Sequence, residues 1–260
     1  MSATPRPVTF SMLWKDFIAF VKKPTLKHGQ GAHALLEGTA HSWQRDWNRI
    51  LPLGVFIKWL CLAWVVNLFL LAPLTFVVSQ KVGAVNKITF TGWDIVLLAV
   101  LWAPLIEETV FRFILRRPSA WTFLIPLSIV LLLAGAHWYN LLLLALLLSA
   151  VIVYIPKKHE HYFVALSFKQ QRRYVCAFPY ILYGMVLLFA FMHTFNYESE
   201  HIPLWAMPFL VLPQMSTGMI LAWLRVRFGI LQSMLFHAAF NGGPVLLMVL
   251  LYAVDPELVN

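Results

Sequence analysis

The chain has 260 residues, of which 60% are hydrophobic and only 12% are charged, and its formal net charge at pH 7 is +9. A soluble domain carries about 25% charged residues, and the mean hydropathy of this chain is +0.74. The composition therefore excludes a soluble globular enzyme, and it predicts an all-α, polytopic transmembrane helix bundle.

Residues 1–50 form the first predicted region, which we expect on the cytoplasmic side. They lack an uninterrupted apolar core, so we expect no secretory signal. Apolar residues recur there at helical spacing, namely Phe10, Leu13, Trp14, Phe17, Ile18 and Val21, whereas Lys15, Asp16, Lys22 and Lys23 lie off that stripe. The pattern predicts an amphipathic interfacial helix on the inner leaflet. A helix packed onto the cytoplasmic ends of the bundle fits the same pattern.

Residues 51–260 are predicted to form one transmembrane domain. Apolar stretches predict about seven spans, at 52–79, 92–115, 119–136, 138–155, 177–196, 204–224 and 229–254. The division of 119–155 stays open, because the turn at Gly135 to Asn140 could equally be a kink. Cys61 falls in the first span and Cys176 at the cytoplasmic start of another, so we expect no disulfide and interpret both as buried small hydrophobes.

The positions of the 20 Lys and Arg residues predict the topology. Basic residues gather before the first span, after the second, between the fourth and fifth, and after the sixth: Arg6, Lys15, Lys22, Lys23, Lys27, Arg45, Arg49, Arg112, Arg116, Arg117, Lys157, Lys158, Lys169, Arg172, Arg173, Arg225 and Arg227. The alternate loops hold only Lys81 and Lys87, and their tips carry Glu198, Glu200, Asp255 and Glu257. The positive-inside rule then predicts a cytoplasmic N-terminus and an external C-terminus. The basic excess indicates topology, and we expect a lipid bilayer and no nucleic acid as partner.

Two adjacent carboxylates, Glu107 and Glu108, lie inside the apolar stretch 95–115. An ionisable side chain at bilayer depth costs about 2.5–3.5 kcal/mol on insertion scales, and it usually faces a bundle interior or a wet cavity. Arg112 follows Glu108 by one helical turn, so these two side chains can pair. Glu107 points about 100° away and is left for chemistry. A functional site is favoured over a structural ion pair.

Three further polar residues lie at membrane depth in two other predicted spans. His193 closes the segment 189–193, and His237 and Asn241 are spaced i, i+4, so that both project from one helical face. A lone buried histidine is more often a satisfied core residue. Polar residues on three spans are harder to explain by packing, because each needs a partner in hydrocarbon. We therefore predict one shared site.

The chemistry of such a set is hydrolysis. A carboxylate beside an imidazole can take a proton from water and return it to a leaving group, and a second histidine with an amide can stabilise an oxyanion. No Ser or Cys is placed beside the histidines in a recognisable way, which favours direct attack by water over an acyl-enzyme. The H-E-x-x-H spacing of many zinc proteases is absent. We expect no cofactor, although two histidines and a glutamate could still bind zinc.

Three motifs in these segments resemble those of one known family. Residues 107–112 resemble an E-E-x-x-x-R motif, 189–193 an F-x-x-x-H motif and 237–241 an H-x-x-x-N motif. This is the CPBP family of intramembrane proteases, which covers CAAX-processing and bacteriocin-processing enzymes and is also called the Abi family. The resemblance spans about residues 92–254, and residues 1–91 carry none of its motifs.

The resemblance implies an intramembrane endopeptidase, in which glutamate and histidine activate water. It implies the following roles: Glu107 as the base, His193 as its partner, His237 and Asn241 as oxyanion donors, and Glu108 and Arg112 as supporting residues. The family includes CAAX endopeptidases, which cleave after a prenylated cysteine, and bacterial members with no established prenyl substrate. We therefore expect a protein or peptide substrate, lipidated or not, and a multi-pass protein of a plasma membrane such as the bacterial inner membrane.

Two features depart from the family pattern. The first histidine often follows the glutamates at a shorter distance, where this chain has His137; taking His193 instead makes 119–155 an inserted hairpin. In addition, the predicted spans place His193 toward the external side and Glu107 and His237 in the cytoplasmic half, unless a late helix start near Pro179 or a tilt closes the gap.

Two other functions compete with proteolysis. A transporter or channel-like protein could use the same Glu and His residues to relay protons or bind an ion. The sequence shows no inverted repeat and no matched pair of broken spans that would favour it. An inactive membrane scaffold is the other alternative, although every residue that hydrolysis needs is present.

Overall fold

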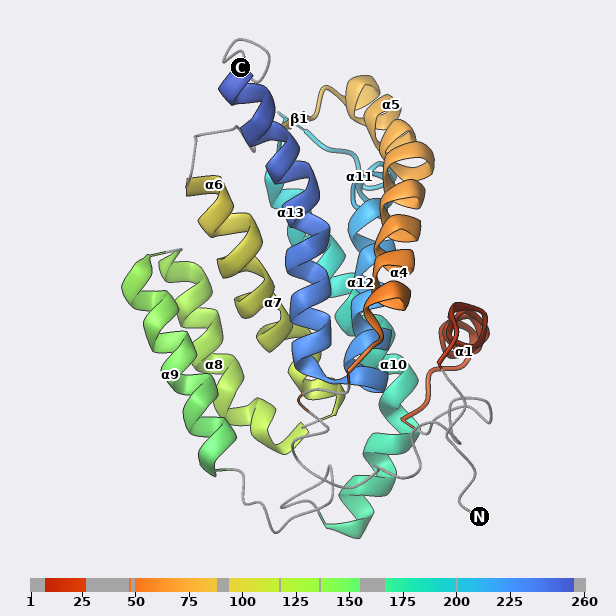
Figure 1. Ribbon diagram of the computed structural model, residues 1–260, viewed down its shortest axis with the longest axis vertical. Helices are drawn as coiled ribbons and strands as arrows, with labels where there is room; N and C mark the ends of the chain where they lie inside the picture. The colour runs from red at the N-terminus through yellow and green to blue at the C-terminus, as the bar shows by residue number, and fades with distance from the viewer. Residues whose placement is uncertain are drawn as a thin grey trace.

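The computed structural model describes residues 8–26, 47, 50–87, 94–116, 118–135, 137–154, 167–199 and 201–254, and they are mostly helical (Figure 1). The helices are α1 (Phe10–Lys22), α4 (Leu53–Val65), α5 (Ala72–Val82), α6 (Asp94–Val96), α7 (Ala103–Arg112), α8 (Pro118–Ala134), α9 (Trp138–Tyr154), α10 (Phe168–Met192), α11 (Met207–Leu210), α12 (Leu212–Phe228) and α13 (Ile230–Val254). The π-helical turns η2 (Val66–Leu71) and η3 (Leu97–Trp102) join α4 to α5 and α6 to α7, and the 3-10 turns η4 (Phe113–Leu115) and η5 (His193–Asn196) follow α7 and α10. Two short strands, β1 (Val85–Asn86) and β2 (Tyr197–Glu198), pair antiparallel.

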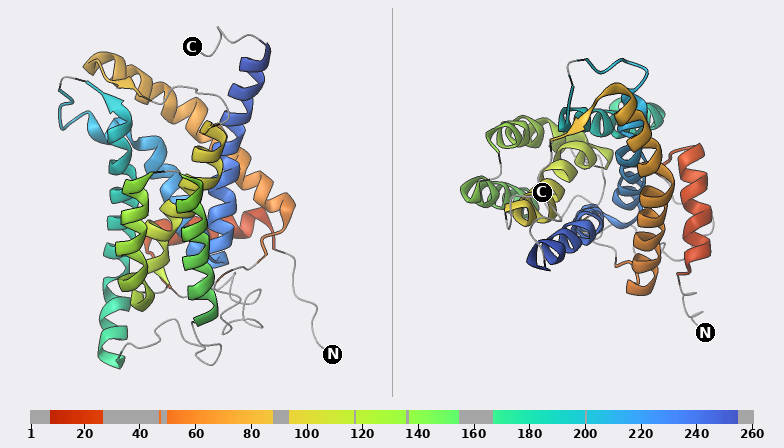
Figure 2. Two further views of the ribbon diagram at one scale, coloured as in Figure 1. Left: turned by 90° about the vertical axis from the view of Figure 1, so that its left-hand side faces the viewer. Right: turned by 90° about the horizontal axis from the view of Figure 1, so that it is seen from above.

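The helices form one bundle around α13. This helix packs against α12, α4 and the continuous segment from α6 to α7, and α10 packs against α12 and α7. The α8–α9 hairpin lies at the outer edge of the bundle, with α8 on α7 and α9 on α8 (Figures 1 and 2). The arrangement brings α7, α10 and α13, which carry the three motifs, into one part of the bundle.

Three helices among the described residues are long and apolar enough to cross a membrane. They are Leu53–Val82, Phe168–Asn196 and Ile230–Val254, with 30, 29 and 25 residues. Helical residues occur in every predicted span, but 204–224 is divided between α11 and α12, and the count of about seven spans is not confirmed. The α8 and α9 helices have 17 residues each, and α7 and α12 carry charged residues within their apolar sequences.

The start of α10 differs from the prediction. The helix begins at Phe168, nine residues before the predicted 177, and Pro179 lies inside it. A capping box explains the early start, because the Ser167 hydroxyl accepts from Gln170 N and the Gln170 side chain accepts from Ser167 N at 2.8 Å. The α10 helix therefore projects beyond the neighbouring helices at one end of the bundle (Figure 1), and a late start near Pro179, one of the two ways considered to bring His193 closer to the glutamates, does not occur.

Two backbone carbonyls without a helical partner receive side-chain donors from other helices. Pro244 has no N–H for the Phe240 carbonyl, and Trp64 Nε1 donates to that carbonyl at 3.0 Å. The Phe209 carbonyl lies at the end of α11, and the Thr75 hydroxyl donates to it at 3.0 Å. An unpaired buried carbonyl is costly, so both bonds stabilise the bundle.

The α1 helix forms as predicted, but it packs on the bundle. It lies across the other helices (Figures 1 and 2) and buries Leu13 and Phe20 against them. Asp16, predicted off the apolar stripe, is also buried; its Oδ2 accepts from Trp223 Nε1 and from Arg227 Nε, both at 2.8 Å. The apolar face of α1 therefore packs on the bundle, which is one of the two predicted placements of this helix.

The connection between α8 and α9 decides between the turn and the kink that the sequence left open. Gly135 has a left-handed φ of +84° and its carbonyl accepts from Asn140 Nδ2 at 2.9 Å. The segment 119–155 therefore folds as two helices joined by a turn, and not as one kinked helix.

Cys61 and Cys176 are free, as expected, but both are exposed and not buried. Apolar side chains also occur on the outer surface of a folded protein, which is why hydrophobic character misplaced them.

Candidate functional site

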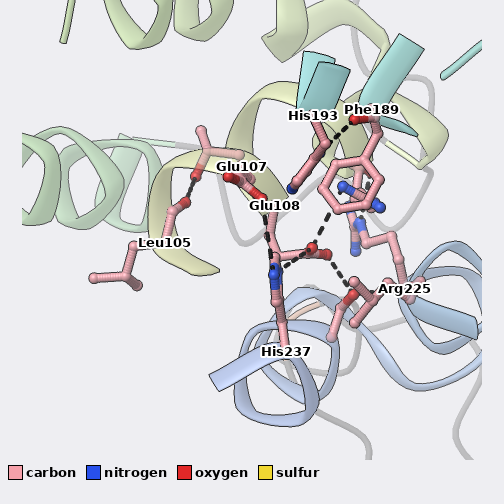
Figure 3. Close-up of polar contacts among 11 residues, drawn as sticks. Leu105, Glu107, Glu108, Phe189, His193, Arg225 and His237 are labelled. Atoms are coloured by element: carbon pink, nitrogen blue, oxygen red, sulfur yellow. Dashed lines mark hydrogen bonds and ion pairs between the residues drawn. The ribbon is translucent and has the colours of Figure 1, made fainter. Parts of the chain in front are cut away.

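The site is centred on His237 of α13, whose ring lies between the two glutamates of α7 (Figure 3). His237 Nδ1 is 3.0 Å from Glu108 Oε1, and His237 Nε2 is 3.7 Å from Glu107 Oε2. Glu108 is fully buried, whereas 19% of the Glu107 side chain is exposed. One carboxylate is thus enclosed by protein and the other is reachable from outside the cluster.

Arg112 holds Glu108 from the other side, as the i, i+4 spacing predicts. Its Nη1 is 3.5 Å from Glu108 Oε1, and its guanidinium carbon lies 3.7 Å from the centroid of the Phe189 ring. Arg225 Nε donates to the Arg112 backbone carbonyl at 3.2 Å, which ties α7 to α12. The predicted pairing of Glu108 with Arg112 is confirmed.

Phe189 and His193 bring α10 into the site. The Phe189 ring lies edge-on to both histidines, with centroid distances of 4.8 Å to His193 and 6.0 Å to His237. His193 Nδ1 donates to the Phe189 carbonyl at 2.8 Å, so the other ring nitrogen is directed away from the backbone. In Figure 3 the His193 ring points toward the glutamate pair. This placement removes the depth difficulty raised by the predicted spans.

Ser233 is a site residue that sequence reasoning missed. Its hydroxyl is fully buried and lies 2.5 Å from Glu108 Oε2 and 2.9 Å from the Leu221 carbonyl. The sequence analysis considered serines only beside the histidines, whereas Ser233 contacts the glutamate. The signal was available, because Ser233, His237 and Asn241 are spaced i, i+4, i+8 on one face of α13.

Asn241 lies one turn beyond His237 on the same helix, as predicted. Its amide Nδ2 donates to the Ala99 carbonyl at 2.9 Å, and Ala99 belongs to the π-helical turn η3 that precedes α7. Asn241 therefore joins α13 to the start of the glutamate helix. An amide nitrogen carries two hydrogens, so this bond leaves the second N–H for another acceptor.

His137, the alternative motif histidine, lies elsewhere. It is in the α8–α9 connection at the outer edge of the bundle, where its ring stacks on Tyr139 at 5.1 Å and 9° (Figure 1). The structure thus gathers Glu107, Glu108, Arg112, His193 and His237 around one cluster, connects Asn241 to it through α13, and leaves His137 outside.

No group of three or more His, Cys, Asp or Glu side chains that could hold a metal ion together occurs among the described residues. Zinc binding, which the sequence left open, can be tested by chelation.

Comparisons with known proteins add no relative to this picture. No family model, no curated protein and no solved structure matches the chain. The motifs and the geometry of the site are the observations on which a function can be argued.

Proposed function

We propose that this protein is an intramembrane endopeptidase that hydrolyses a peptide bond with water activated by Glu107. The observation that carries the proposal is the position of His237 between Glu107 and Glu108. A single reachable carboxylate next to an oriented imidazole is the arrangement that general acid–base hydrolysis requires.

The two carboxylates that face its ring support a donor role for His237. Carboxylate oxygens accept hydrogen bonds, and His237 Nδ1 and Nε2 lie 3.0 Å from Glu108 Oε1 and 3.7 Å from Glu107 Oε2. In the proposed mechanism His237 donates through Nδ1 to Glu108 and presents Nε2–H beside Glu107.

The reaction follows from these positions. Glu107 takes a proton from water as the oxygen attacks the peptide carbonyl carbon, and the negative charge moves to the carbonyl oxygen. His237 Nε2–H and the second amide hydrogen of Asn241 donate to that oxyanion, and His193 holds the water from the α10 side. When the C–N bond breaks, Glu107 returns the proton to the leaving amine.

The membrane setting of this reaction is part of the proposal. Helices α7, α8, α9 and α12 would complete a bundle of about seven spans with the three long apolar helices. The ends of α7 and α12 and the start of α10 lie at one end of the bundle (Figure 1) and carry Arg116, Arg227 and Lys169, which supports a cytoplasmic placement of that end. Other charges used for this topology, among them Lys157, Lys158, Glu200, Asp255 and Glu257, lie outside the described residues. The substrate would be a protein or peptide presented near that face of a plasma membrane, lipidated or not.

The test uses purified full-length protein in detergent and a library of quenched fluorescent peptides, half of them carrying a prenylated cysteine. We expect cleavage by the unaltered protein and its loss in Glu107→Gln, because the amide cannot accept the proton of water. Both proteins should unfold at the same temperature. Near-normal turnover by the variant would remove Glu107 from the mechanism.

Two further arms of the same assay address the alternatives. Activity should survive exhaustive chelation, because the side chains suffice for activation of water; loss with specific recovery by zinc would assign a metal mechanism instead. Proton uptake into vesicles that carry the protein, abolished by Glu107→Gln in the absence of any cleavage, would favour the transporter.

A further inference from the structure

Two buried polar atoms on α12 have no hydrogen-bond partner among the described residues. They are Oε1 of Gln214 and Oγ1 of Thr217, and Thr217 is only 4% exposed. A threonine hydroxyl inside a helix usually donates to the carbonyl four residues earlier, as Thr109 does to Leu105 at 2.7 Å. Thr217 makes no such bond among the described residues, so its hydroxyl needs a different partner.

These two side chains share a helical face with residues that contact the site. Gln214 is spaced i, i+4 from Gly218, and Thr217 is spaced i, i+4 from Leu221, so the four residues share one helical face. A Cβ on Gly218 would lie 3.3 Å from Arg112 Nη2, and the Leu221 carbonyl contacts the Ser233 hydroxyl. The unsatisfied atoms therefore lie on the face of α12 that leads to Arg112 and Glu108.

Arg112 contributes further unsatisfied groups at the inner end of this face. Its Nη1 and Nη2 have no hydrogen-bond partner among the described residues, apart from the 3.5 Å ion pair of Nη1 with Glu108. Donors on Arg112 and acceptors on Gln214 and Thr217 are thus present together without being bonded to one another. Water, which donates and accepts, can satisfy all of them, whereas a dry packing would leave each one desolvated.

The outer end of the same face reaches a cavity. A cavity of about 390 Å³ lies between α5, β1, β2 and α12, at the end of the bundle that carries β1 and α11 (Figure 1). Its lining includes the polar residues Thr75, Ser79, Gln80, Asn86 and Tyr197 among apolar ones, and it also includes Pro213, the neighbour of Gln214 in the chain. A cavity with polar groups in its wall therefore adjoins the first of the unsatisfied side chains.

We propose that the face of α12 from Pro213 to Gly218 is a hydrated passage that connects this cavity to Arg112 and the glutamate pair. Its ligand is water, which is consumed in the hydrolysis of a peptide bond; this purpose rests on the proposed function, whereas the passage itself does not. Gly218 lies at the inner end of this face, where a Cβ would be only 3.0 Å from the Phe189 ring and 3.3 Å from Arg112 Nη2, so a larger residue there would displace one of them.

Cysteine accessibility tests the passage directly. The exposed Cys61 and Cys176 are first replaced by alanine, and Gln214→Cys, Thr217→Cys and Met215→Cys are then made singly. Met215 is the matched control, because it lies between the other two along α12 but packs against the apolar cluster around Trp59. The probe is a cationic methanethiosulfonate, applied to the purified full-length protein in detergent micelles. We expect labelling at residues 214 and 217 to be at least tenfold faster than at 215. Equal rates at the three positions, or no reaction at residue 217, would overturn the proposal.

A second variant keeps the test independent of cysteine chemistry. Thr217→Val replaces the hydroxyl with a methyl group of similar size. If the hydroxyl binds water, the unfolding temperature should stay the same or fall, because a satisfied polar group is lost. If the site is dry, the variant should unfold at a higher temperature, and this result would contradict the passage.

Labelling is also measured in the Glu107→Gln background, so that the two proposals can fail separately. Fast labelling at residue 217 together with unchanged cleavage by Glu107→Gln would leave the passage standing and reject the proposed catalysis. Slow labelling at residue 217 together with loss of cleavage by Glu107→Gln would reject the passage and support the proposed catalysis.

Discussion

Two buried ion pairs in this protein differ in what surrounds them. Asp16 on α1 and Arg227 on α12 meet at 2.8 Å, with Trp223 on the same carboxylate oxygen and the Arg227 guanidinium carbon 4.9 Å from the Phe20 ring centroid. Glu108 and Arg112 meet at 3.5 Å, next to a second carboxylate and an imidazole. The first pair contains one carboxylate, and its 2.8 Å hydrogen bonds join α1 to the bundle. The second pair lies beside two further titratable groups, Glu107 and His237, and Glu107 is partly exposed.

The difference indicates how the use of a buried charge can be recognised. A pair that serves to anchor a helix needs only its own charges to be balanced and bonded. A pair that serves chemistry is surrounded by further groups, which it orients and whose charges it balances. By this criterion the α7–α13 cluster suits the proposed catalysis and the α1–α12 cluster suits an anchor, and substitutions in the two should differ in kind.

The largest effect is expected for Glu108→Gln, which should lower both activity and stability. The variant leaves Arg112 buried without its charge partner and weakens the orientation of His237. Removal of one partner of a buried pair costs about 3–5 kcal/mol in general. Cleavage and thermal unfolding are measured side by side with Glu107→Gln, which should lose cleavage alone. Equal stability of the two variants would show that their roles have been divided wrongly.

His193→Ala should abolish cleavage, whereas His137→Ala should leave it unchanged. The His193 ring points toward the glutamates, whereas His137 stacks on Tyr139 at the edge of the bundle. Initial rates of peptide cleavage by the two purified variants check the prediction. The opposite pattern would move the site toward the α8–α9 hairpin.

Asp16→Ala should destabilise the protein by about 3–5 kcal/mol and leave kcat of the folded protein unchanged. It removes the acceptor of Trp223 and the charge partner of Arg227. Lys15→Ala is the matched control, because Lys15 is the exposed neighbour on the same helix and its loss should cost less than about 0.5 kcal/mol. A fall in kcat of the folded Asp16→Ala protein would show that the two clusters are coupled.

Asn241→Ala should destabilise the protein less than Asp16→Ala does, because its loss is divided between catalysis and packing. If the second amide hydrogen donates to the oxyanion, kcat should fall by about 10²–10³-fold with little change in KM. Loss of the bond to Ala99 should add about 0.5–1.5 kcal/mol of destabilisation.

Asn241→Asp is the sharper comparison, because a carboxylate repels both an oxyanion and the Ala99 carbonyl. It should be at least as damaging as alanine. An Asp variant with most of the activity would remove Asn241 from the oxyanion site.

The sequence by itself determined the helical class, the membrane-compatible helices and the pairing of Glu108 with Arg112. Each of these depends on residues within a turn or two of one another, or on the average composition of a segment, and helical periodicity relates such residues directly. The site residues Glu107, His193 and His237 were also identified from the sequence, because polar side chains are costly in apolar segments.

The tertiary structure alone decided which partners these residues have. His237 lies between the glutamates, Phe189 lies under Arg112, and Asp16 is bonded to Arg227, across sequence separations that no local pattern relates. Hydrophobic character could not place Cys61 and Cys176, since an apolar residue of such a bundle is equally at home against lipid or against another helix. Periodicity reports which face of a helix a residue occupies, and packing decides what that face meets.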